Sequence, residues 1–255
     1  MLELYHWEPN AASARVLITL KEKGLEFQSR YVDVLSFEQH AAEFLKLNQT
    51  GETPVLTHDG EAFTESSFIC EYLDEAFPAS SLMPQAPYAR WQARTWQKYV
   101  DDHLAAAVSD LAWNALGASA LEARNGSSAQ AAVARIPDRI RREVWREALA
   151  GYSDDQLAKA TGRVETTIKQ MEADLDGHDW LAGDAFSLAD IAVFAYANYL
   201  PGVTPDLVNR RAAPLTMAWL GRVAARPAVK AALAMAKTSD PFAVAAPGPE
   251  HIRWG

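Results

Sequence analysis

The sequence has few of the residues that stabilise small secreted or metal-cluster proteins. Cys70 is the one cysteine among 255 residues, which excludes an internal disulfide framework and a metal cluster built from cysteine ligands. Basic residues are also scarce, since 24 lysines and arginines face 33 aspartates and glutamates for a formal net charge of -9. Such a chain repels polyphosphates at long range, so we expect no nucleic acid partner.

Long apolar runs are missing as well. No stretch approaches the roughly 18 residues that span a bilayer. The first residues, MLELYHWEPN, lack the basic start and apolar run of a secretory signal. We therefore expect a cytoplasmic protein that does not bind membranes. The sequence does contain 49% apolar and 22% charged residues, values that are ordinary for a globular chain of one large or two modest domains with a sizeable core.

The first 80 residues alternate between strand and helix signals. Thr53-Pro54 opens an apolar run that cannot lie inside a helix, and Asp59-Gly60 is a strong hairpin signal. The predicted elements are a strand over 2–6, a helix over 11–23, a strand over 27–34, a helix over 37–47, strands over 55–56 and 62–64, and a helix that begins at Glu65 and Ser66. This order predicts an α/β thioredoxin-like domain over residues 1–80.

The second part of the chain contains almost no strand signals. Prolines 78, 84 and 87 mark a linker over 81–87. Helices are predicted over 88–116, 136–150, 154–175, 188–200, 214–225 and 227–237, with capping boxes at Ser153–Gln156 and Ser187–Asp190. In the long first helix, Trp91 and Thr95 are placed on the apolar face. We predict an all-α domain over 88–238 and an extended, proline-rich tail over 239–255.

Glu65 and Ser66 bring a carboxylate and a hydroxyl together at the start of a predicted helix. Free backbone N–H groups and the helix dipole favour an anion there, whereas Glu65 favours an ammonium group. The pair suits the zwitterionic head of an amino acid. A simpler interpretation is that Thr64 caps the helix and that Glu65 complements the dipole, without any ligand.

The order of the two parts, with TPVL before a hairpin, ESS at the third helix and SLADI in the second half, resembles the glutathione transferases over nearly the whole chain. Three longer segments, EKGLEFQSRYVDVLSFEQHAAEF, TESSFICEYLDEAFP and SLADIAVFAYANYL, resemble the bacterial glutathione-dependent β-aryl etherases of lignin breakdown, especially the branch whose first helix begins with serine. The resemblance implies glutathione as co-substrate, a homodimer, and no metal.

By the same resemblance, seven residues bind glutathione: Gln39, His40, Thr53, Pro54, Val55, Glu65 and Ser66. The bond before Pro54 is expected to be cis, and the main chain of Val55 to hold the tripeptide like an added strand. Glu65 and Ser66 would take the γ-glutamyl ammonium and carboxylate. His40, with Gln39, would meet the glycine carboxylate, unless His40 is an ordinary surface histidine. The sequence departs from the family at Thr53, where valine is frequent, and in the NQTG loop, where NPxG is usual.

Ser13, in the first turn of the first helix, is the residue expected to act on the thiol. Lowering a thiol pKa from about 8.5 by roughly 2 units requires about 2.7 kcal/mol. One hydrogen bond to a charged acceptor supplies roughly 1.5–3 kcal/mol, and a helix N-terminus roughly 0.3–1 kcal/mol. Ser13 is therefore a sufficient donor, although an isolated serine at this place can also be a helix cap. Cys70 is expected in the core, which disfavours a mixed-disulfide mechanism.

These expectations lead to one reaction and its rivals. Glutathione thiolate would attack the carbon that bears an aryloxy group next to a carbonyl, with release of the phenol and formation of a thioether. Trp7 and Trp113 are candidate walls for the small aromatic substrate, and both could equally belong to the core. The alternatives are glutathione-dependent dehalogenation, conjugation of another aromatic electrophile, or a non-catalytic glutathione-binding protein.

Overall fold

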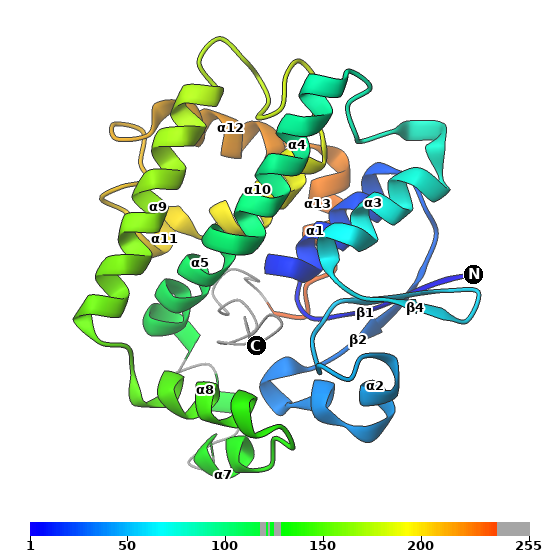
Figure 1. Cartoon of the computed structure of the whole chain (residues 1–255), viewed down its shortest axis with the longest axis vertical. Coiled ribbons are helices and arrows are strands. Elements are labelled where there is room, and N and C mark those ends of the chain that lie inside the picture. The colour runs from blue at the N-terminus through cyan, green and yellow to red at the C-terminus, as the bar shows by residue number, and fades with distance from the viewer. Residues whose placement is uncertain (118–120, 122, 125–128, 239–255) are drawn as a thin grey trace.

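A four-stranded sheet forms the centre of the N-terminal half in the computed structural model, which describes residues 1–117, 121, 123–124 and 129–238 (Figure 1). The strands are β1 (Leu2–His6), β2 (Gln28–Tyr31), β3 (Val55–His58) and β4 (Glu61–Phe63), in the order β2-β1-β3-β4. β1 and β2 are parallel, whereas β3 is antiparallel to both of its neighbours. The predicted tail over 239–255 lies outside the described residues.

Three helices accompany the sheet: α1 (Ala11–Glu22), α2 (Ala42–Leu47) and α3 (Ser66–Ala76). α1 and α3 pack against each other on one face and belong to the main core, whereas α2 covers the other face through a small cluster in which Phe44 meets Tyr5. Figure 1 shows this division on the two sides of the sheet. The predicted thioredoxin-like arrangement is confirmed.

The segment between β2 and α2 differs from its prediction. The helix predicted over 37–47 begins only at Ala42, because Phe37 has a φ of +61° that a helix cannot contain. Residues Val34–Ser36 and Glu38–His40 form two 3₁₀ turns on either side of Phe37. The Asp59-Gly60 hairpin is confirmed, since both residues adopt positive φ.

After the short 3₁₀ turn Pro78–Ser80, the regular elements of the described residues are helices. α4 (Pro87–Tyr99) continues through a π-helical turn, Val100–Leu104, into α5 (Ala105–Ala112) and a second π-helical turn, Trp113–Gly117, so that the predicted helix over 88–116 is continuous. The further helices are α7 (Ala129–Ala134), α8 (Arg139–Ala150), α9 (Asp154–Asp174), α10 (Leu188–Ala197), α11 (Leu200–Val203), α12 (Pro214–Ala224) and α13 (Pro227–Leu233).

The apolar face assigned to the long helix was wrong at its start. Trp91 is 59% exposed and Thr95 is exposed too, whereas Ala93, Trp96 and Val100 form the buried side. A surface helix buries only one stripe of its side chains, and the buried stripe of α4 is the one that packs against α10. Trp91 is therefore left on the outer surface.

α10 joins the two halves into one core. All ten of its residues are buried, and it packs against α1, α3, α4 and α12. Both predicted capping boxes are present, Ser187 with Asp190 at the start of α10 and Ser153 with Gln156 at the start of α9. Within the described ranges, none of the helices combines the length and the apolarity that crossing a bilayer requires.

Candidate active site

One edge of the sheet collects the residues that the sequence singled out. β1 ends at this edge, β3 begins there and β4 ends there, because Tyr5 is paired with Val55 and Leu56 with Phe63 in antiparallel registers. The loop after β1 leads into α1, and β4 leads into α3, so the N-termini of both helices lie at the same edge. The site is thus assembled from chain segments that the sheet brings together.

Ser13 lies in the first turn of α1 and is 1% exposed. Its Oγ accepts a hydrogen bond of 3.1 Å from the backbone N–H of Trp7. Since the oxygen is used as an acceptor on that side, the hydroxyl proton is directed elsewhere and can be donated to an anion. The N-cap of α1 is Asn10, so Ser13 is not the cap of this helix.

The start of α3 has an open N-terminus. Its N-cap is Glu65, which has a φ of +65° and makes no side-chain capping bond. The interpretation with Thr64 as the cap is therefore wrong. Ser66 and Ser67 follow, both nearly buried. A positive φ at a residue other than glycine costs of order 1–3 kcal/mol and tends to persist at functional sites, and N–H groups that no side chain caps can bind a carboxylate.

The loop before β3 has the geometry that the family resemblance implies. The Thr53–Pro54 bond is cis, as predicted. Val55 is fully buried at the start of β3, and the pairing with β4 ends one residue later, at Leu56. Among the described residues, β4 thus does not extend alongside the Val55 main chain. Thr53 is nearly buried, and its Oγ1 has no hydrogen-bond partner in the part of the chain that the structure describes.

His40 and Gln39 lie in the second 3₁₀ turn before α2. The His40 ring stacks on Phe37 with centroids 6.2 Å apart, and it touches Gly51 so closely that a Cβ there would stand 2.7 Å from Nδ1. Gln39 is fully buried, and its Nε2 donates to the Val34 carbonyl at 3.3 Å. Gln39 therefore holds the turn from inside, whereas His40 occupies the more exposed position.

The two tryptophans predicted to line the substrate differ in their surroundings. Trp7 follows β1 beside Ser13, packs on Tyr31 with centroids 5.5 Å apart, and has a buried Nε1 without a partner among the described residues. Trp113 is 1% exposed, donates from Nε1 to the Ala148 carbonyl at 2.9 Å, and packs against Trp145. Trp113 thus lies in the core of the helical half. The substrate-binding role of either residue stays a prediction.

Two buried charges beside the site were not singled out from the sequence. Glu8 is fully buried and accepts hydrogen bonds from the Tyr31 hydroxyl at 2.7 Å and from the Lys237 backbone N–H at 2.9 Å. Arg15 of α1 pairs with Asp101 of the first π-helical turn, with Nη1 and Oδ1 2.5 Å apart. A charge in an amphipathic pattern is normally read as exposed, so only the partners, far apart in the chain, reveal these residues.

Cys70 does not belong to the site. It is buried in α3, where the Thr19 hydroxyl donates to its Sγ at 3.2 Å, and burial raises the pKa of the thiol to about 11. The expectation of a core cysteine is confirmed, since a thiol of this kind is inert at neutral pH. Among the residues that the structure describes, no group of three or more His, Cys, Asp or Glu side chains could hold a metal ion.

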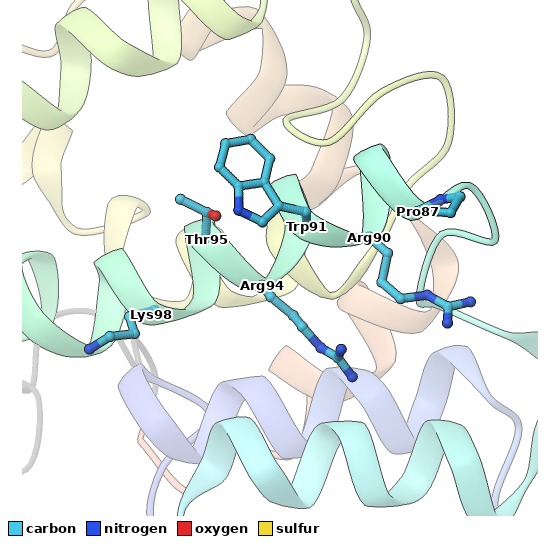
Figure 2. Close-up of a pocket in the computed structure, with 6 residues that line it drawn as sticks. All are labelled: Pro87, Arg90, Trp91, Arg94, Thr95 and Lys98. Atoms are coloured by element: carbon cyan, nitrogen blue, oxygen red, sulfur yellow. The ribbon is translucent and has the colours of Figure 1, made fainter.

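A groove of about 610 Å³ follows the outer side of α4, away from the sheet edge. Trp91 stands exposed on it, and Arg94 reaches down to α3, where it pairs with Glu71 at 3.0 Å (Figure 2). Tyr88 stacks on Trp91 with centroids 5.6 Å apart, and Phe68 of α3 is 69% exposed. Exposed apolar side chains thus lie on the outer faces of α3 and α4.

Comparisons with known proteins cover both halves of the chain. Residues 1–75 match the model of the glutathione S-transferase N-terminal domain, and residues 132–227 match that of the C-terminal domain. Protein LigF of Sphingobium sp. (strain NBRC 103272 / SYK-6) is 38% identical over 94% of this chain and 95% of its own length. Glutathione transferase GST 23 of Zea mays is 31% identical over 86% of this chain and 83% of its own length.

Solved structures agree with these relatives. The structure of the β-etherase LigF from Sphingobium sp. strain SYK-6 superposes with a TM-score of 0.85 at 38% identity, covering 91% of this chain and 98% of that one. A glutathione transferase from Burkholderia graminis, with two glutathione molecules bound per subunit, has the same fold with a TM-score of 0.70 at 23% identity, covering 93% of this chain and 89% of that one.

Proposed function

This chain belongs to the glutathione S-transferase family, and we propose that it cleaves β-aryl ether bonds of lignin-derived α-keto aromatic compounds with glutathione as its co-substrate. The observation that carries the proposal is the 38% identity, over 94% of the chain, to a Sphingobium protein whose solved structure is described as a β-etherase. Residues 1–80 would hold glutathione, and residues 88–238, after the linker 81–87, would face the aromatic substrate.

The glutathione cradle follows the sheet edge. The Val55 main chain pairs with the cysteinyl part of the tripeptide next to Pro54 and Thr53. The γ-glutamyl carboxylate binds at the open N-terminus of α3 with the Ser66 hydroxyl, and the Glu65 carboxylate binds the ammonium group. His40 binds the glycine carboxylate, while Gln39 holds the turn that carries it.

Ser13 stabilises the thiolate. The thiol proton leaves to solvent, and the Ser13 hydroxyl donates to the sulfur while its oxygen keeps the bond from the Trp7 N–H. The sulfur then attacks the carbon that carries the aryloxy group and lies next to the carbonyl. A C–S bond forms, the C–O bond breaks with its electron pair on oxygen, and the phenolate takes a proton from water. A phenol pKa near ~10 makes this leaving group acceptable.

The substrate would lie against the Trp7 side of the site. Trp7 is adjacent to Ser13 and only 3% exposed, so its indole N–H, which has no partner among the described residues, would reach a substrate oxygen after a local side-chain movement. Trp113 is covered, so it would affect the substrate indirectly, through its contact with Trp145 and the packing of α8.

The exposed aromatic cluster on α3 and α4 supports the expected homodimer. Tyr88 and Trp91 of α4, with Arg90 and Arg94 beside Trp91, offer a second copy of the chain an apolar patch with a charged rim, and Phe68 is a further exposed aromatic residue on α3. The cytoplasm is the proposed compartment, because the reaction consumes reduced glutathione and the one cysteine is a free thiol.

The test is incubation of the protein with glutathione and a guaiacylglycerol-type β-aryl ketone. Guaiacol and the glutathione thioether should appear in equal amounts, and both enantiomers should be assayed separately. Turnover of chlorinated conjugation substrates without guaiacol release would replace ether cleavage with general conjugation or dehalogenation. Absence of glutathione binding by calorimetry would remove the enzyme proposal altogether.

A further inference from the structure

The segment from Asp33 to Glu52, here called the His40 segment, contains little regular structure, although Val34 and Leu35 in its first turn are buried in the main core. It consists of two 3₁₀ turns, the six-residue helix α2 and connecting loops, with a left-handed residue, Phe37, between the turns. The apolar cluster beneath α2 is small, with Phe44 as its centre. His40 itself is only partly buried on this segment. Contacts from another part of the molecule would therefore help to hold a binding residue at this position.

The helical half provides that support through α8. Trp145, a fully buried residue of α8, meets Phe37 edge-on with ring centroids 5.1 Å apart. Phe37 in turn stacks on His40. Figure 1 shows α8 beside the turns that precede α2. One route from the helical half therefore ends at the His40 ring.

A second route runs through charges. Arg141 of α8 has only 8% of its side chain exposed, and its Nη2 lies 2.9 Å from Oε1 of Glu52. Glu52 follows Gly51, which touches His40, and it precedes the Thr53–Pro54 loop. At the far end of the segment, Arg124 pairs with Asp33 and donates to Ser36. Arg124 is largely exposed, so its pair contributes less than that of Arg141.

We infer that α8 positions His40 for the glycine carboxylate of glutathione, with Arg141 and Trp145 as its positioning residues. The inference rests on the proposed function of the sheet edge. Two contacts from one helix lead to His40, one through Phe37 and one through Glu52 and Gly51. Recognition of the glycine end of the tripeptide thus depends on the helical half, whereas Val55, Glu65 and Ser66 hold the other two residues from the thioredoxin-like half alone.

Glutathione and γ-glutamylcysteine together test this inference, because the dipeptide lacks the glycine carboxylate. Arg141→Met should weaken glutathione binding about tenfold, and it should change γ-glutamylcysteine binding by less than roughly twofold. With the β-aryl ketone as substrate, KM for glutathione should rise while kcat at saturating glutathione stays the same. Arg141→Lys, which keeps the charge, should restore most of the glutathione affinity.

Arg146→Met is the matched control. Arg146 lies on the same helix, but it is half exposed and pairs with Glu143 within α8. This variant should bind both peptides as the wild type does. Equal weakening of both peptides by Arg141→Met, or no weakening of either, would overturn the inference while leaving glutathione binding by the wild type intact. A wild type that binds neither peptide would instead refute the proposed function.

Should Arg141→Met fail to fold, Trp145→Phe decides the matter. Trp145→Phe keeps an aromatic ring of smaller size, so part of the contact with Phe37 is lost. Trp145→Phe should lower the preference for glutathione over γ-glutamylcysteine, and the amides of residues 34–47 should exchange hydrogen faster than in the wild type. An unchanged preference would count against the inference.

Discussion

Ser13 illustrates how one polar side chain is prepared for an anion. Its oxygen is already occupied by the Trp7 N–H at 3.1 Å, so its proton is the group left to donate. The serine is fixed by α1, and the residue is 1% exposed. A buried donor of this kind stabilises the thiolate more than it stabilises the thiol, which is the condition for a lowered thiol pKa.

Replacement of Ser13 by alanine should raise the pKa of bound glutathione by about 1–2 units, since the lost bond is worth roughly 1.5–3 kcal/mol. The thiolate is the reactive form, so kcat/KM at pH 7 should fall roughly ten- to hundredfold and recover as the pH rises above the new pKa. The ultraviolet absorption of the thiolate, titrated on the complex, measures this shift directly.

Ser153→Ala is the control for Ser13→Ala, because Ser153 caps α9 and lies at an exposed helix start in the other half of the chain. It should leave the thiol pKa unchanged. An unaltered pKa in Ser13→Ala would assign the thiolate to another donor.

Asp190 predicts a pH dependence of stability. Burial raises the pKa of Asp190 from 3.8 to about 6, although Trp219, Leu181 and Ser187 all donate hydrogen bonds to it. The folded state binds the proton more tightly than the unfolded state. The stabilisation from protonated Asp190 is therefore complete below pH 3.8 and is lost as the pH rises through about 6.

Asp190→Asn removes this titration. The free energy of unfolding of the wild type, minus that of the variant, should decrease by up to roughly 3 kcal/mol between about pH 4 and pH 6. Urea denaturation followed by tryptophan fluorescence at several pH values gives this difference. A difference that is flat or that increases with pH would show that the Asp190 carboxyl does not bind its proton more tightly in the folded protein.

At the scale of helices and strands, the two capping boxes offer a matched pair. Ser187 is buried at the start of α10, whereas Ser153 is exposed at the start of α9. Because water cannot replace the lost acceptor at the buried position, Ser187→Ala should cost about 2 kcal/mol and Ser153→Ala about 0.5 kcal/mol. Chemical denaturation of the two variants measures both values. A larger cost for Ser153→Ala would refute this argument.

Local signals in the sequence were sufficient for most elements. β1, the Asp59-Gly60 hairpin and both capping boxes depend on neighbours within four residues, and they were predicted correctly. The helix break at Phe37 was not predictable, because the sequence has no glycine or proline there to indicate a left-handed residue. One of the aromatic partners of Phe37, Trp145, also lies far away in the sequence. The same is true of Glu8 and Arg141, each of which has a hydrogen-bond partner more than 80 residues away.

In the candidate site, too, some features could be predicted from the sequence and others could not. The cis bond before Pro54 follows from the resemblance and is confirmed. The outward position of Trp91 was missed, because periodicity alone cannot distinguish a stripe that faces the core from one that faces another molecule. The features that could not be predicted from the sequence mostly depend on contacts between the two halves.

For the whole molecule, the exposed surface of α4 predicts the assembly. Trp91→Lys places a charge in the exposed aromatic pair that Trp91 forms with Tyr88. If a second copy covers this surface, the variant should sediment with the mass of a single chain, about half that of the wild type. Sedimentation equilibrium over a range of protein concentrations measures both masses.

Leu215→Lys provides the comparison, since Leu215 is an exposed apolar residue at the start of α12, away from the groove. The mass of the Leu215→Lys variant should equal that of the wild type. A wild type that sediments as one chain would leave the aromatic cluster on α4 without the proposed partner.

The bond between Glu8 and Lys237 has a consequence for the synthesis of the protein. The two residues are 229 positions apart, and α1 packs against α13 near the end of the described chain (Figure 1). At about 5–20 residues per second, a ribosome needs roughly 11–46 seconds to pass from one to the other. During that time the Glu8 carboxylate of the emerging chain lacks the hydrogen bond from the Lys237 N–H. Translation must pass α13 and reach Lys237 before the loop after β1 can form this hydrogen bond.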